Sequence, residues 1–178
     1  MQKRRLFLCV LAFSALPILA GFFQQANFNV KTGLWESTVV TNASGAPPVP
    51  DDVMARLTPE QQQKMAAAME ASKAHAAQPH TTRFCLTQDK MDRGFQQDHS
   101  DRPNCKQTVV TNTASVLEVQ QECSNNMGKS VMTFHYQAIN SETVTGKIHT
   151  VMTGGNRSMV ADSTLQGKWI SASCGDVK

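Results

Sequence analysis

The residues from 80 to 171 alternate apolar and polar side chains in segments separated mainly by short, turn-rich links. This period of two is typical of β-strands with one buried face. The predicted strands cover residues 80–87, 106–112, 115–123, 129–140, 142–153 and 158–171. A parallel crossover needs a dozen or more residues, so strands joined by short links are antiparallel neighbours.

A further strand is expected over residues 33–42, which are rich in β-branched and aromatic side chains. The fold class is therefore mainly β, an antiparallel meander of about seven strands that forms a curved sheet or a partly open barrel. On the strand at 142–153 one row of side chains should face the core: Val144, Gly146, Ile148, Thr150 and Met152.

One inserted helix interrupts this pattern within residues 51–78. Thr58 can cap it, Pro59 suits its first turn, and Gln61 completes a capping box. The helix should span residues 59–77 and be weakly amphipathic. Its predicted packing face comprises Met65, Ala68, Met69, Ser72 and Ala76.

The amino terminus predicts export. Residues 1–5 are basic and residues 6–23 are apolar, which is the layout of a secretory signal peptide. Small residues at Ala20 and Gly21 place the cleavage near position 21, so we expect a signal peptide at 1–21 and a single β domain at 22–178. The protein should then be periplasmic or secreted.

Two details bear on how the chain would meet a membrane. Pro17 and the break at Gly21 favour cleavage over retention as an anchor, so no membrane span is expected after cleavage. Phe22 stands where the lipidated cysteine of a lipoprotein would be, so a lipoprotein is not expected.

Without the three basic residues at positions 3–5, the 17 Lys and Arg fall to 14, equal to the 14 Asp and Glu. A neutral chain offers no electrostatic case for nucleic acid as a partner.

Four cysteines remain after removal of Cys9 with the signal, and an oxidising compartment would pair them. Three pairings of Cys85, Cys105, Cys123 and Cys174 are possible. We favour Cys85 with Cys105, which closes a polar loop, and Cys123 with Cys174, which ties the carboxyl end to a middle strand. A zinc site is disfavoured because no Cys-x-x-Cys occurs.

Short motifs in a fixed order run through the chain. They are Lys31-Thr32-Gly33-Leu34-Trp35-Glu36, a Pro-Glu-Gln helix, Arg83-Phe84-Cys85-Leu86-Thr87, Cys105-Lys106, Thr143-Val144-Thr145-Gly146 and Lys168-Trp169-Ile170 before Cys174. With this order the chain resembles a bacterial exported family, the domain of unknown function family 3617, over about residues 31–175. The resemblance implies export, an antiparallel β fold and paired cysteines, and it implies no activity.

No hydrolase, metalloprotease or dinucleotide motif is present, so we expect no catalytic residues and no cofactor. Metal binding has only weak candidates. His135, His149 and Met132 lie on adjacent predicted strands, and imidazole and thioether groups suit copper. A two-residue hairpin at Asn140-Ser141 would place His149 opposite Met132.

An apolar ligand site has better candidates. Trp35 and Trp169 lie near the two ends of the expected β domain, on strands that can be neighbours, and small barrels often enclose such ligands. With Phe134 and Leu165 they could line a cavity, and core packing is the alternative. The expected function is a non-catalytic binding or envelope-associated accessory domain, whose partner would be an envelope protein. The alternatives are an apolar-ligand carrier and a periplasmic copper-binding protein.

Overall fold

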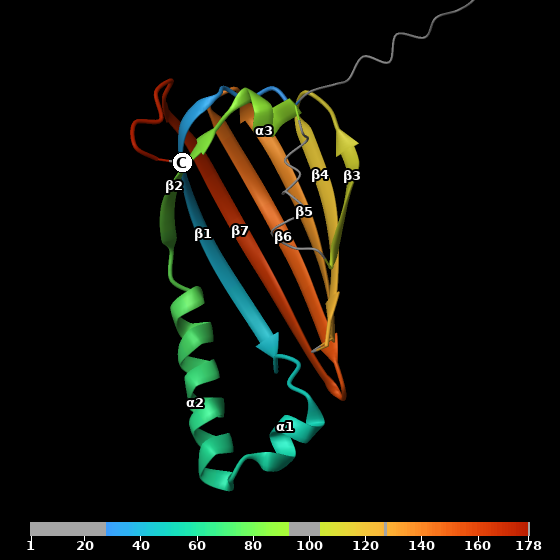
Figure 1. Cartoon of the computed structure of the whole chain (residues 1–178). Helices are drawn as coiled ribbons and strands as arrows, with labels where there is room; N and C mark the ends of the chain where they lie inside the picture. Colours follow the sequence, from blue (N-terminus) through green and yellow to red (C-terminus); the bar gives the residue numbers. More distant parts are fainter. Residues whose placement is uncertain (1–27, 93–103, 127, 178) are drawn as a thin grey trace, which may run out of the picture.

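A computed structural model describes residues 28–92, 104–126 and 128–177 and contains one antiparallel sheet of seven strands (Figure 1). The predicted signal peptide at 1–21 lies outside the described residues. The strands are β1 (Gly33–Gly45), β2 (His80–Leu86), β3 (Cys105–Asn112), β4 (Val116–Asn125), β5 (Gly128–Asn140), β6 (Thr143–Gly154) and β7 (Arg157–Ser171). The helices are α1 (Asp51–Arg56), α2 (Pro59–Ala76) and α3 (Gln88–Asp92). The mainly β, antiparallel fold predicted from the sequence is confirmed.

The strand order is β2-β1-β7-β6-β5-β4-β3, so the sheet is a meander only from β3 to β7. β1 pairs with β7 and β2 pairs with the far side of β1. The chain therefore passes from one edge of the sheet to the other between β2 and β3. The alternation within each strand does not report this step, because it indicates which face is buried and not which strand is adjacent.

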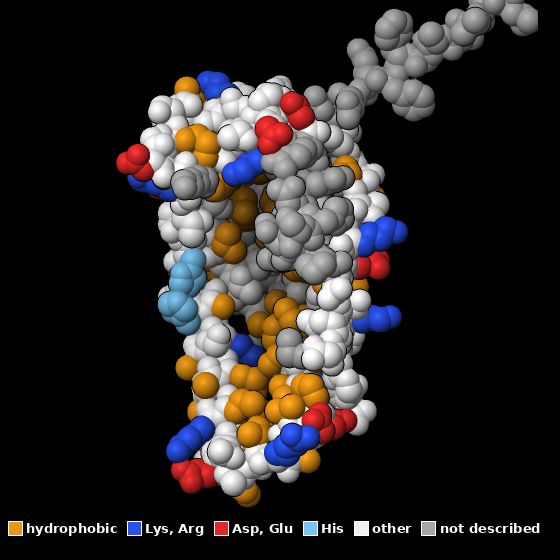
Figure 2. Space-filling model, viewed as in Figure 1, with side chains coloured by type: hydrophobic (Ala, Val, Ile, Leu, Met, Phe, Trp, Pro, Cys, Tyr) orange, Lys and Arg blue, Asp and Glu red, His pale blue; other side chains and the backbone are white. Residues whose placement is uncertain are grey.

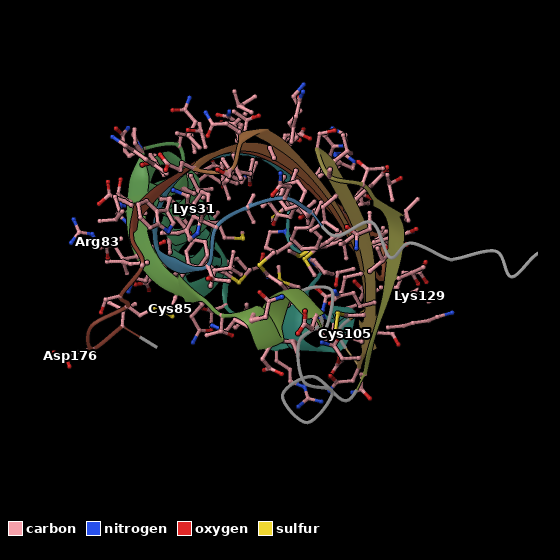
Figure 3. All side chains as sticks on the ribbon, turned by 90° about the horizontal axis from the view of Figure 1, so that it is seen from above. Lys31, Arg83, Cys85, Cys105, Lys129 and Asp176 are labelled. Carbon is pink, nitrogen blue, oxygen red and sulfur yellow. A yellow bond between two sulfur atoms is a disulfide. The ribbon has the colours of Figure 1, made fainter. Side chains whose placement is uncertain are left out.

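The sheet is strongly curved, and Figure 3 shows from above how it wraps around a space filled by side chains, with β2 and β3 as its edges. The predicted inward row of β6 is on the concave face, where its neighbours on β7 are Gly167, Leu165, Ser163, Ala161 and Met159. The buried core is small and lies on the same face: Phe28, Val30, Trp35, Leu86, Leu117, Val119 and Val144.

Residues 28–32 close the upper end of this curved sheet. The backbone N–H of Asn29 donates to the Ala114 carbonyl at 2.9 Å, beside the β3–β4 turn. The N–H of Lys31 donates to the Ser141 carbonyl at 2.9 Å, in the β5–β6 turn. Phe28 and Val30, next to these bonding residues in the chain, are buried. The segment thus crosses from the β3–β4 turn to the start of β1 and covers the apolar side chains below it.

Helices α1 and α2 connect β1 to β2 and extend beyond the lower end of the sheet (Figure 1). The predicted capping box is present, because Thr58 and Gln61 exchange hydrogen bonds at 2.8 and 3.3 Å. The predicted packing face is only partly correct. Met65, Met69 and Ala76 are half-buried, whereas Ala68 and Ser72 are exposed and α2 has no buried residue. The reason is that α2 touches mainly the end of β1, where Lys73 Nζ donates to the Gly45 carbonyl at 2.8 Å.

The four predicted disulfide cysteines are paired, but the favoured connectivity was wrong. The bonds join Cys85 to Cys174 and Cys105 to Cys123. Cys105 and Cys123 are direct cross-strand partners in the β3–β4 hairpin, and their Cα atoms are 4.0 Å apart. Cys85 is on the opposite edge strand, two strands from β7, so the segment after β7 brings Cys174 to it. The predicted bond between Cys85 and Cys105 does not form because β2 and β3 lie at opposite edges of the sheet.

Among the helices that the structure describes, none combines the length and the apolar character needed to cross a lipid bilayer.

Candidate ligand-binding site

The upper half of the concave face contains a cavity of about 350 Å³. Residues 28 and 30 border it above, the sheet forms its wall, and edge strand β2 contributes to one side. Figure 2 looks into this face and shows hydrophobic side chains inside the hollow. Most lining residues are apolar: Phe28, Val30, Trp35, Phe84, Leu86, Leu117, Val144 and Leu165, with Gly167 between them. A volume of this size is at the small end of the range for ligand pockets.

Two inward-facing glycines lie at or next to the cavity, and only Gly167 leaves open space in its wall. Gly167 on β7 lies between Ser37 on β1 and Val144 on β6. Gly146 on β6 is opposite Tyr136 on β5, and a Cβ added there would be 2.8 Å from Tyr136 Cδ1. The tyrosine ring therefore occupies the space that a side chain at position 146 would fill. At Gly167 an added Cβ would meet its neighbours only at 3.6 Å or more.

The polar groups of the cavity are hydroxyls, from Ser37, Thr82 and Tyr136. No acidic, basic or histidine side chain is among its described lining residues. Burial raises the pKa of Tyr136 from 10.0 to about 12, because desolvation disfavours the phenolate. Ser37 is 5% exposed, and its Oγ is buried with no hydrogen-bond partner among the described residues. The described lining of the cavity is thus apolar and uncharged, and the Ser37 hydroxyl in its wall is fully buried and unpaired.

The four predicted ligand-lining residues all lie on the concave face. Trp35 and Leu165 line the cavity, whereas Phe134 and Trp169 pack against the core beside it. Trp35 and Trp169 are cross-strand partners, so the expectation that their strands are neighbours is confirmed. Their indole N–H groups donate to the carbonyls of Lys31 and Thr32 at 2.8 and 3.0 Å. These bonds attach residues 31 and 32 to the sheet.

Sequence reasoning missed other residues of the cavity. Phe28 and Val30 precede the first strand, and only their apolar character in a polar stretch could have drawn attention to them. Phe84 and Leu86 belong to the family motif at residues 83–87, but nothing in that motif indicates that they line a cavity. Tyr136 belongs to the inward row of β5, and its place at the cavity depends on the glycine opposite it.

The copper candidates are not brought together. His149 is opposite Thr133 and not Met132, because the hairpin turns at Ser141 and Glu142 instead of Asn140 and Ser141, and a register shift between Ala138 and Asn140 reverses only part of that displacement. Met132 pairs with Thr150 and is on the concave face, whereas His135 and His149 alternate to the convex face. There His149 Nδ1 lies 2.7 Å from Asp162 Oδ1. The described residues contain no group of three or more His, Cys, Asp or Glu side chains arranged to hold a metal.

The fold and the cavity define a disulfide-linked, curved antiparallel sheet with a small apolar pocket. The chain belongs to the family described as Protein of unknown function (DUF3617), which it matches over residues 30–174. Comparison with curated proteins and with solved structures gave no match.

Proposed function

We propose that this protein is exported and binds a small apolar molecule in the cavity of its concave face. The observation that carries the proposal is the cavity itself, about 350 Å³ beside a core of few buried residues and lined almost entirely by apolar side chains. Binding of an apolar ligand would remove the exposed part of this surface from water, which is favourable by about 25 cal/mol per Å². A flat sheet with a filled core would instead have favoured docking of a protein partner.

Export is supported by two features. The basic and apolar residues of 1–21 have the layout of a signal peptide. The two disulfides, Cys85–Cys174 and Cys105–Cys123, are of a kind that persists in oxidising compartments. Mass spectrometry of the exported fraction would reveal a chain shortened near residue 21, whereas an uncleaved chain would contradict this part of the proposal.

Ligand binding is tested with N-phenyl-1-naphthylamine, a neutral dye that fluoresces in apolar surroundings. The wild type is compared with Gly167→Ala and Gly167→Leu, which fill the cavity in two steps, since a Cβ at 167 fits without a clash. Gly167→Leu should weaken dye binding by about tenfold or more, and Gly167→Ala by less. The matched control is Gln166→Leu, which adds an exposed apolar side chain on the convex face.

Each result of the dye-binding experiment either supports or contradicts the proposed site. A graded loss across the two Gly167 variants, with binding retained in Gln166→Leu, supports the cavity as the site. Unchanged binding in Gly167→Leu, with unfolding by urea showing that the variant is folded, would contradict the proposal. So would the absence of dye binding to the wild type.

A further inference from the structure

The hydroxyl of Ser37 differs from the other hydroxyl groups of the same strand. Thr41 lies four residues further along β1 on the same face, and its Oγ1 is 2.7 Å from Ser163 Oγ across the strand pair. Ser37 occupies the equivalent position opposite residue 167, which is glycine. The β1–β7 pair therefore offers Thr41 a side-chain partner and offers Ser37 none, and Ser37 makes no hydrogen bond to Thr82, its partner on β2.

This unpaired hydroxyl is buried inside the cavity wall. Ser37 faces the concave side between Trp35 and Val39, and its Oγ is the fully buried side-chain polar atom without a partner in the described part of the chain. A buried hydroxyl without a hydrogen bond is destabilising, because it has lost its bonds to water. Such groups are rare in folded proteins, and a bound molecule that completes the hydrogen bond is one explanation for them.

The surroundings restrict the charge of that molecule. The described lining has no cation to pair with a carboxylate or a phosphate and no anion to pair with an amine. Desolvation already raises the pKa of Tyr136 to about 12, which indicates that charge is disfavoured at this wall. An ionic head group would lose its hydration with no compensating partner.

We propose that the ligand is a neutral apolar molecule with a single carbonyl oxygen, and that this oxygen accepts a hydrogen bond from Ser37 Oγ. The inference rests on the proposed function, because it assigns the chemistry of the same cavity. The apolar part of the ligand lies along Trp35, Val144 and Leu165, and Ser37 lines the same cavity opposite Gly167, which has no side chain to cover it. A cavity of this volume has room for about a dozen groups the size of a water molecule.

The test uses three probes of matched shape: isopropylbenzene, acetophenone and benzoate, which differ in having no oxygen, a neutral carbonyl and a charge. Their dissociation constants are measured by protein-observed NMR at pH 8 for the wild type and for Ser37→Ala. The matched control is Ser163→Ala, which removes a hydroxyl from the same face at a position that already has a partner.

Ser37→Ala should weaken acetophenone binding about 3- to 10-fold and leave isopropylbenzene binding unchanged or tighter. Ser163→Ala should leave the dissociation constants of acetophenone and isopropylbenzene at their wild-type values. Benzoate should bind to the wild type more weakly than acetophenone does. An equal effect of Ser37→Ala on both neutral probes would overturn the role of Ser37, while their binding would leave the proposed function standing. Benzoate binding as tightly as acetophenone would overturn the neutral class. Failure of all three probes to bind would contradict the proposed function itself.

Discussion

At the scale of single residues, two inward glycines have different neighbours and should respond differently to the same change. A Cβ at Gly146 would lie 2.8 Å from the Tyr136 ring, whereas a Cβ at Gly167 would lie at ordinary contact distance, 3.6 Å from Trp35 Cε3. Gly146→Ala must displace the ring and should lower the free energy of unfolding by about 1–3 kcal/mol. Gly167→Ala should change it by less than about 1 kcal/mol. Unfolding by urea measures both, and equal losses would contradict this account of the wall.

Tyr136 is the one tyrosine of the chain, so its ionisation can be followed directly by ultraviolet absorbance. Burial raises the pKa of its hydroxyl from 10.0 to about 12. The folded state holds this proton more tightly than the unfolded state, so the associated stability is complete below pH 10 and is lost as the pH rises toward 12. The folded protein should titrate about two units above the same chain in denaturant. A midpoint near 10 in both states would place the hydroxyl in water.

At the scale of elements, the two disulfides constrain loops of very different length. Cys105 and Cys123 are 18 residues apart, whereas Cys85 and Cys174 are 89 residues apart. Restriction of the unfolded chain predicts losses of about 3 and about 4.5 kcal/mol when each pair is replaced by alanine. The double variants, compared by urea unfolding, should therefore rank with Cys85→Ala/Cys174→Ala as the less stable. The opposite ranking would contradict the assigned roles of the two bonds.

The strands show what sequence patterns can and cannot predict. Alternation located six of the seven strands and the inward row of β6, because burial of one face has a period of two, and residue composition located β1. Alternation could not locate the turn at Ser141 and Glu142 or the register shift between Ala138 and Asn140, which together place His149 opposite Thr133. The register of a hairpin depends on its turn, and the alternation within one strand does not specify that turn. The copper hypothesis failed at this step.

At the scale of the whole molecule, the fold class followed from the short links and the sheet order did not. Strands β2 and β3 are consecutive in the chain but lie at opposite edges of the sheet, and nothing in the alternation of either strand indicates this. The disulfide connectivity depends on that order, which is why the favoured pairing was wrong. Half of the predicted lining was found in place, since Trp35 and Leu165 face the cavity. The contribution of residues 28–32 arises from long-range hydrogen bonds that no local pattern encodes.

Under the proposed function, the concave face is a binding surface and the convex face is an ordinary protein exterior. Apolar side chains on the two faces provide an internal comparison. Leu86, Leu117, Val144 and Leu165 line the cavity, whereas Val110, Ile139 and Ile170 are 56%, 58% and 39% exposed elsewhere. A ligand in the cavity must change the surroundings of the first set and leave the second set unchanged.

The most direct test of ligand binding is therefore a methyl NMR titration of the intact, disulfide-bonded protein with isopropylbenzene. We expect saturable shift changes in the methyl groups of Leu86, Leu117, Val144 and Leu165, with Val110, Ile139 and Ile170 unaffected. Shift changes spread over the exposed methyl groups, or none up to the solubility of the probe, would show that the concave face is only a core and would contradict the proposal.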